Sequence, residues 1–181
     1  QFHAIGFPTT RNEEWRFTSV APIAKFEFKP VLQFDPSGAT RTDVAKFSFD
    51  TEHRLVFING HFASELSSVG SLPKGVVIGS LASAVRSSDS NAVSFLARQV
   101  KIDETPFVSL NTAFLQDGAF IFVPDGTTLD DSIQLLFIAS EKKPFLASPR
   151  NLVIVGKRSR VSIVESYVSV TDQTYLTNAV T

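Results

Sequence analysis

Histidine is the side chain best suited to metal binding or proton transfer near neutral pH. This chain carries three, His3, His53 and His61. Asn59-Gly60, a pair that tolerates the positive φ angles of a type I′ turn, predicts a hairpin that pairs Ile58 with His61 and His53 with Leu66. His53 and His61 would then lie about 17 Å apart along the ladder, too far for one metal ion to bridge. We therefore expect each histidine to be solvated or hydrogen-bonded.

Glu165 is the carboxylate with the strongest claim to a functional site. It lies in the middle of a β-rich run, on the same alternating face as Ile163 and Tyr167. If that face is buried, the carboxylate needs a polar partner and becomes a candidate site residue. If the opposite face, with Ser162, is the buried one, Glu165 is an ordinary exposed residue.

Other polar segments have simpler interpretations. Adjacent carboxylates occur in three pairs: Glu13-Glu14, Asp103-Glu104 and Asp130-Asp131. Such pairs are usually helix-start or turn residues, so we interpret each as structural. Gly156 to Ser159 resembles a phosphate-binding loop, but that pattern needs a glycine at Asn151 and a hydroxyl at Arg158. We interpret the segment as a polar turn and expect no ATP binding.

Cysteine is absent from the chain. Disulfides, thiolate nucleophiles and thiolate metal ligands are therefore excluded here. The G-x-S-x-G and H-E-x-x-H patterns of common hydrolases are also missing. We expect a protein that is not an enzyme, with no catalytic, cofactor-binding or metal-binding residue in this chain.

Composition narrows the class of protein further. The 181 residues are 43% hydrophobic with a formal net charge of -1, which suits a globular chain and not a nucleic-acid binder. No apolar run approaches the roughly 20 residues of a transmembrane helix, and no secretory signal is recognisable. We expect an intracellular protein with neither nucleic acid nor membrane as a partner.

Methionine is absent and the chain stops within a predicted strand, so we also expect a fragment or a processed product.

The elements that position the candidate residues begin with a helical amino-terminal region. Thr10 and Glu13 fit a capping box, which predicts a short helix through Trp15 and Phe17 that ends before Pro22. Trp15 could anchor a partner or pack on the core, and we favour packing. The Asn59-Gly60 hairpin is expected near residues 54–66. Between Lys25 and Phe49, short apolar runs and prolines indicate strands and turns.

Two helices are expected after the hairpin. The first carries an apolar face made of Ala92, Phe95, Leu96 and Val100. The second begins at Thr105-Pro106, carries Phe107, Leu110 and Phe114, and ends before Gly118. From Ala119 onward five β-rich runs follow: AFIFV, IQLLFIA, NLVIV, VSIVESYV and YLTNAV. The Val123-Pro124-Asp125-Gly126 segment fits a type I turn, which predicts a reversal of the chain between the first two runs. Sandwiches, barrels and β-helices all share this spacing, so these three folds stay open.

The segment FPTTRNEEWRFT, Phe7–Thr18, resembles the amino-terminal signature of SufD proteins in the SufB/SufD family. Further similar segments follow in the family's order: LNTAFLQDGAFIFVPDG at Leu110–Gly126, PRNLVIVG at Pro149–Gly156, IVESYVS at Ile163–Ser169 and YLTNAVT at Tyr175–Thr181. The later segments are shared with the paralogue SufB. The opening segment favours SufD.

The resemblance implies a mainly β fold with a helical amino-terminal region that leads into a right-handed parallel β-helix. Residues 1–118 would form the mixed α and β region, and residues 119–181 the first, truncated turns of the β-helix. Because such a truncation leaves open strand edges, we expect the isolated chain to self-associate, with a homodimer as one outcome.

The implied function is that of a non-catalytic scaffold subunit of the SufB-SufC-SufD complex, which assembles iron-sulfur clusters and uses ATP through SufC. SufB and SufC are the expected partners, in the cytoplasm or, for a plant protein, in the plastid stroma. The family's known interface residues would lie beyond Thr181. Two alternatives stay open, the paralogue SufB and a carbohydrate-active β-helix enzyme that would use Glu165, Asp130 and Asp131.

Overall fold

The computed structural model describes residues 2–96, 98 and 105–181. Within them, every helix precedes residue 115 and the rest of the chain is built from strands and turns. The helical elements are α1 Phe2–Ile5, η1 Glu13–Trp15, α2 Ala21–Ala24, η2 Pro36–Gly38, α3 Arg41–Phe47, η3 Ser64–Leu66, α4 Leu81–Arg86, α5 Ser90–Phe95 and α6 Pro106–Phe114. None of these helices is long and apolar enough to span a bilayer.

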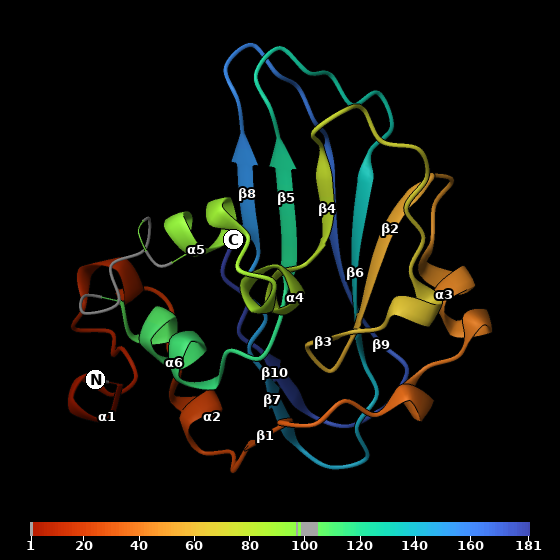
Figure 1. Cartoon of the computed structure of the whole chain (residues 1–181). Coiled ribbons are helices and arrows are strands. Elements are labelled where there is room, and N and C mark those ends of the chain that lie inside the picture. Colours follow the sequence, from red (N-terminus) through yellow and green to blue (C-terminus); the bar gives the residue numbers. More distant parts are fainter. Residues whose placement is uncertain (1, 97, 99–104) are drawn as a thin grey trace.

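The strands form three sheets (Figure 1). They are β1 Lys29–Pro30, β2 His53–Ile58, β3 His61–Phe62, β4 Val77–Ser80, β5 Ala119–Val123, β6 Ile133–Ala139, β7 Phe145–Ala147, β8 Leu152–Val155, β9 Ile163–Ser169 and β10 Tyr175–Thr177. Sheet A has the order β1-β7-β10, sheet B β3-β2-β6-β9 and sheet C β4-β5-β8. Pairing is parallel except for β2 with β3 and β4 with β5. The fold is thus mixed α/β, with no closed barrel among the described residues.

The chain visits the three sheets in a repeating order. Strands β5, β6 and β7 lie in sheets C, B and A, and β8, β9 and β10 lie in the same sheets in the same order. We call each such passage a circuit. Thirty-two residues separate the paired residues Phe120 and Leu152. Thirty separate Ile133 from Ile163. Strands β1, β2 and β4 extend the same three sheets, and the division at residue 118 stays a prediction.

Both faces of the central strands are covered. All seven residues of β6 are buried. Leu135 faces a core shared with Leu55 of β2 and Ile121 of β5. Leu136, on the opposite face, packs in a second cluster with Val44 of α3. In Figure 1, α3 lies beside β2 at one side of the sheets, while α4, α5 and α6 lie toward the other. Strands covered on both faces explain the continuous apolar runs of the sequence.

The Asn59-Gly60 hairpin is confirmed in its turn and corrected in its register. Asn59 has φ 51 and Gly60 has φ 90, as a type I′ turn requires. Ile58 pairs with His61, but the predicted pairing of His53 with Leu66 is wrong. Because η3 interrupts the returning strand, the pairing resumes as an isolated bridge between Arg54 and Ser68.

The reversal predicted between the first two β-rich runs is not observed, although the segment after β5 does form a turn. Gly126 adopts φ 68 within it. The turn does not join an antiparallel pair, because β5 belongs to sheet C and β6 to sheet B. It therefore carries the chain from one sheet to the next.

The capping box predicted at Thr10 and Glu13 is wrong. The helix there is a single 3-10 turn whose N-cap is Asn12, and no side chain caps it. Instead the Asn12 side-chain oxygen accepts hydrogen bonds from the backbone N–H and the hydroxyl of Thr9, at 2.9 and 3.2 Å. Asn12 thus stabilises the turn that precedes the helix. Phe17, which the predicted helix would have included, lies beyond its end and is 92% exposed.

The two helices predicted after the hairpin are observed with different limits. Asp89 caps α5, whose Ala92 is buried, while Val100 lies outside the described residues. Pro106 begins α6 as predicted, and Leu110 is buried, although the Thr105 side chain makes no cap bond.

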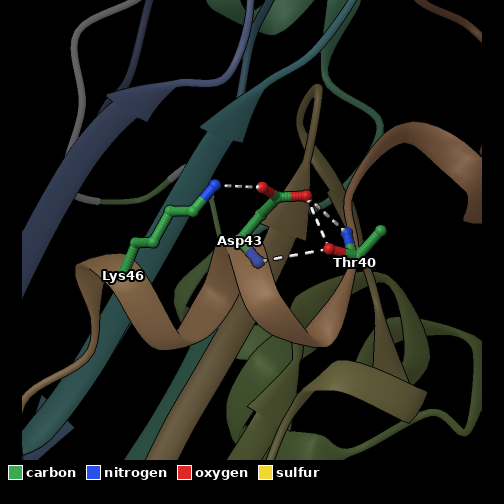
Figure 2. A network of polar contacts seen from close by, with 3 residues as sticks. All are labelled: Thr40, Asp43 and Lys46. Carbon is green, nitrogen blue, oxygen red and sulfur yellow. Dashed lines mark hydrogen bonds and ion pairs between the residues drawn. The ribbon is translucent and has the colours of Figure 1, made fainter.

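A complete capping box begins α3, which the sequence analysis did not predict (Figure 2). The Thr40 hydroxyl accepts from the Asp43 N–H at 3.2 Å, and an Asp43 carboxylate oxygen accepts from the Thr40 N–H at 3.0 Å. The other carboxylate oxygen pairs with Lys46 at 3.0 Å. The side-chain and backbone hydrogen bonds from Thr40 lower the pKa of Asp43 from 3.8 to about 2.

Replacing Thr40 with alanine should raise the pKa of Asp43 toward its ordinary value, because the largest lowering interaction is lost. A carboxyl group with a lowered folded-state pKa stabilises the fold above its unfolded value of 3.8 and loses that effect as pH falls toward 2. Carboxyl chemical shifts followed by NMR between pH 5 and 2 would measure the change. Thr42→Ala, at an exposed position of the same helix, is the control. Equal Asp43 pKa values in both variants would contradict the assignment.

Candidate functional site

The three histidines lie in different surroundings. His3 is exposed in α1. His61 places its Nε2 3.0 Å from the carbonyl oxygen of Val31. His53, at the start of β2, is only 2% exposed. Of the three, His53 is the one that lies close enough to carboxylates of the described residues to share a metal ion with them.

We call this group, made of Glu52, His53 and Asp131, the His53 cluster. A nitrogen of His53 and one oxygen from each carboxylate lie within 4.8 Å of one another. The parallel pairing of His53 with Ile133 brings the segment before β6 next to β2. Adjacent carboxylates are usually turn residues, so the sequence predicted a structural role for Asp131 and gave no sign of its neighbours in β2, which lie far away along the chain.

Glu165 lies on the inward-facing side of β9. Ile163, on the same face, packs against the core between sheets B and C, but no residue of β9 is fully buried and Tyr167 is 41% exposed, so this face is only partly buried. The Glu165 carboxylate accepts hydrogen bonds from the Tyr167 hydroxyl at 2.6 Å and the Thr181 hydroxyl at 2.8 Å. Burial, and then Glu165, raise the pKa of Tyr167. The carboxylate is already bonded, which suits a structural acceptor.

A buried polar group joins α6 to the sheets, and we call its members Asn111, Arg150 and Asn178 the α6 clamp. The Asn111 amide donates to the carbonyl oxygens of Pro149 at 2.8 Å and Asn178 at 2.7 Å. Its side-chain oxygen accepts from Arg150 Nε at 2.9 Å. The Asn178 amide donates to the Phe107 carbonyl at 2.8 Å. The clamp thus connects three segments that are distant in the sequence.

Arg150 is the charged member of the α6 clamp and is 4% exposed. Burial lowers its pKa. Its Nη2 donates to the Thr112 hydroxyl at 2.7 Å, and no carboxylate pairs with it among the described residues. The α6 clamp could not be predicted from the sequence, since only the fold brings these polar residues into one buried site.

The remaining candidates have structural roles where the structure describes them. The Lys157 N–H donates to the Asp125 carboxylate at 2.7 Å, which confirms a polar turn seated on the turn of the previous circuit. Glu13 and Glu14 are exposed in η1, and Asp103-Glu104 lies outside the described residues. Trp15 packs against Phe107 of α6 with ring centroids 5.2 Å apart, as the packing interpretation predicts.

Comparison with known families gives a match to the model described as the SufBD protein N-terminal region, over residues 1–135. This chain belongs to the SufBD family. A SufBD-family iron-sulfur cluster assembly protein from Synechocystis is 32% identical over 91% of this chain and 36% of its own length. The iron-sulfur cluster assembly protein SufD of Bacillus subtilis is 26% identical over 88% and 36%. The chloroplastic protein ABCI7 of Arabidopsis thaliana is 24% identical over 96% and 37%.

This SufBD chain therefore matches a little over a third of the length of each of these relatives. The α6 clamp takes one residue from each of three segments that resemble the SufB/SufD family, with Asn111, Arg150 and Asn178 as the contributors. In this SufBD chain, those segments therefore supply contacts that hold the fold together.

Proposed function

We propose that this protein is a SufD-type scaffold subunit that works with SufB and the ATPase SufC in iron-sulfur cluster assembly, without catalytic activity of its own. The observation that carries the proposal is the match to the SufBD amino-terminal region, together with the similarity to a relative named SufD. We place this activity in the cytoplasm, or in the plastid stroma for a plant protein. A chloroplastic relative and a bacterial relative both support that placement.

The arrangement of the ionisable residues supports a scaffold more than a carbohydrate-active enzyme. Glu165 is bonded to Tyr167 and Thr181, whereas Asp131 lies in the His53 cluster. Glu165 and Asp131, two of the three acidic residues that such an enzyme would combine on one sheet face, thus belong to separate groups of contacts.

We further propose that the three sheets begin a right-handed parallel β-helix. Two successive circuits pass through sheets C, B and A in the same order, with parallel pairing in every sheet. Strands β8, β9 and β10 each have an edge without a partner strand among the described residues. In the proposed β-helix, the next circuit would pair with these edges. In the isolated chain, the same edges favour self-association.

Affinity purification of the full-length protein from its own cells tests the proposed partners. A tagged copy should bring down SufB and SufC together, and the purified protein should show no ATP hydrolysis until SufC is added. Recovery of SufD and SufC in place of SufB would instead support the SufB-type alternative. Recovery of neither partner, or turnover of a polysaccharide by the protein alone, would contradict the scaffold proposal.

A further inference from the structure

The His53 cluster contains two carboxylates that form no ion pair within the part of the chain that the structure describes. Neither Glu52 nor Asp131 has a hydrogen-bond or ion-pair partner for its carboxylate among the described residues. Both side chains are exposed, while the imidazole beside them is 2% exposed. Two negative charges close together repel each other, and a bound cation removes that repulsion.

Two features outside the cluster influence where its carboxylates lie. The Thr51 hydroxyl donates to the Ser132 carbonyl, which ties the segment carrying Asp131 to the segment carrying Glu52. A Cβ added to Gly70 would lie 2.3 Å from a Glu52 carboxylate oxygen. The φ of Gly70 is not positive, so the backbone itself does not require glycine there. Gly70 therefore makes room for the Glu52 carboxylate.

The segment that carries Asp131 is also longer than its counterpart in the next circuit. Thr128 pairs with Arg160, and Ile133 pairs with Ile163. Four residues lie between Thr128 and Ile133, and two lie between Arg160 and Ile163. The additional length carries an acidic residue to the buried imidazole.

We propose that Glu52, His53 and Asp131 form a binding site for one divalent transition-metal ion. One imidazole nitrogen and two carboxylate oxygens, without a thiolate, suit borderline ions such as Zn²⁺, Co²⁺ or Mn²⁺ and do not suit Cu(I). Bonds of about 2.0–2.2 Å would draw the two exposed carboxylates inward, and water would complete the coordination. The ion would join the start of β2 to the segment that enters β6.

Metal binding changes one observable hydrogen bond. The Gly70 N–H donates to His53 Nδ1 at 3.3 Å and to the Glu52 carbonyl oxygen at 3.1 Å. If Nδ1 binds the metal, the ion replaces the N–H. If Nε2 binds it, the ring proton moves from Nε2 to Nδ1, which can then no longer accept. In either case Gly70 keeps only its bond to Glu52, so its amide NMR signal should shift.

Cobalt titration of the full-length protein, freed of metal by a chelator, tests the site. The visible absorption of Co²⁺ should report one ion bound and should disappear when Zn²⁺ displaces it. In a separate titration with Zn²⁺, which is diamagnetic, the Gly70 amide signal should shift as the site fills. Asp131→Asn and Glu52→Gln should each weaken binding at least about tenfold. Asp130→Asn alters the exposed neighbouring carboxylate and should leave the affinity within about twofold, since that residue lies outside the cluster.

Three results would overturn the proposal. The first is the absence of Co²⁺ binding at millimolar concentration. The second is an equal loss of affinity in the Asp130 and Asp131 variants, which would indicate only general negative charge. The third is binding that leaves the Gly70 amide signal unchanged, because the ion would then be bound elsewhere in the protein.

Discussion

Gly118→Ala should lower the free energy of unfolding by roughly 3 kcal/mol, at the upper end of the usual cost of overpacking. A Cβ at this position would lie 1.8 Å from the Arg150 carbonyl oxygen and 2.4 Å from the Arg150 carbonyl carbon. Both atoms belong to the backbone, so no side-chain rotation relieves the overlap. The two segments have to separate, and Arg150 would be displaced from the α6 clamp.

Gly79→Ala is the matched control for this substitution. Gly79 lies in β4 of the same protein, and a Cβ there meets nothing within 4 Å. Its φ is not positive, so alanine should change stability by less than about 1 kcal/mol. Urea unfolding of the full-length protein, followed by far-UV circular dichroism, compares the two. Similar midpoints for both variants would show that residue 118 is not in close contact with Arg150.

Asn111→Ala should destabilise the protein by about 3–4 kcal/mol, because three buried groups lose their partner at once. Arg150 Nε loses its acceptor, and the carbonyl oxygens of Pro149 and Asn178 lose their donor. Asn111 has no exposed surface, so water reaches these groups only if α6 moves. We therefore expect local opening of α6 to increase before the whole protein unfolds.

Hydrogen exchange measured by mass spectrometry tests this expectation. Amides of α6 should exchange faster in Asn111→Ala, while those of β6, which is buried along its whole length, should change least. Gln116→Ala, an exposed position just after the same helix, is the control and should leave exchange unchanged. If the α6 amides were equally protected from exchange in the Asn111 and Gln116 variants, the clamp would not be what holds the helix.

Local signals in the sequence predicted local structure well. Asn59-Gly60 predicted the hairpin turn, and Pro106 predicted the start of α6, because both depend on backbone preferences of a few neighbouring residues. The apolar runs after Ala119 predicted strands for the same reason. The capping box was misplaced because the Thr10–Glu13 pattern met the rule without a helix long enough to use it, while Thr40 pairs with an aspartate.

These local signals could not predict contacts between segments that are distant in the sequence. The three residues of β7 show no distinctive strand pattern in the sequence. This short strand is stabilised by its pairing with β1 and β10, which are distant along the chain. The His53 cluster depends on the parallel register of β2 with β6. The α6 clamp depends on where helix α6 meets the segments that follow β7 and β10. Such register and loop positions follow from the whole fold, which is why polar residues as buried as Asn111 gave no signal of their own.

The circuits also limit how this chain can change in length during evolution. Inside a strand, one inserted residue would turn every following side chain to the wrong face, since successive side chains alternate. Between strands, an insertion shifts no register. The segment between Thr128 and Ile133 already holds two residues more than its counterpart before Ile163. Gaps in alignments of related proteins should therefore gather at these corners, where new side chains can be added without rebuilding a sheet.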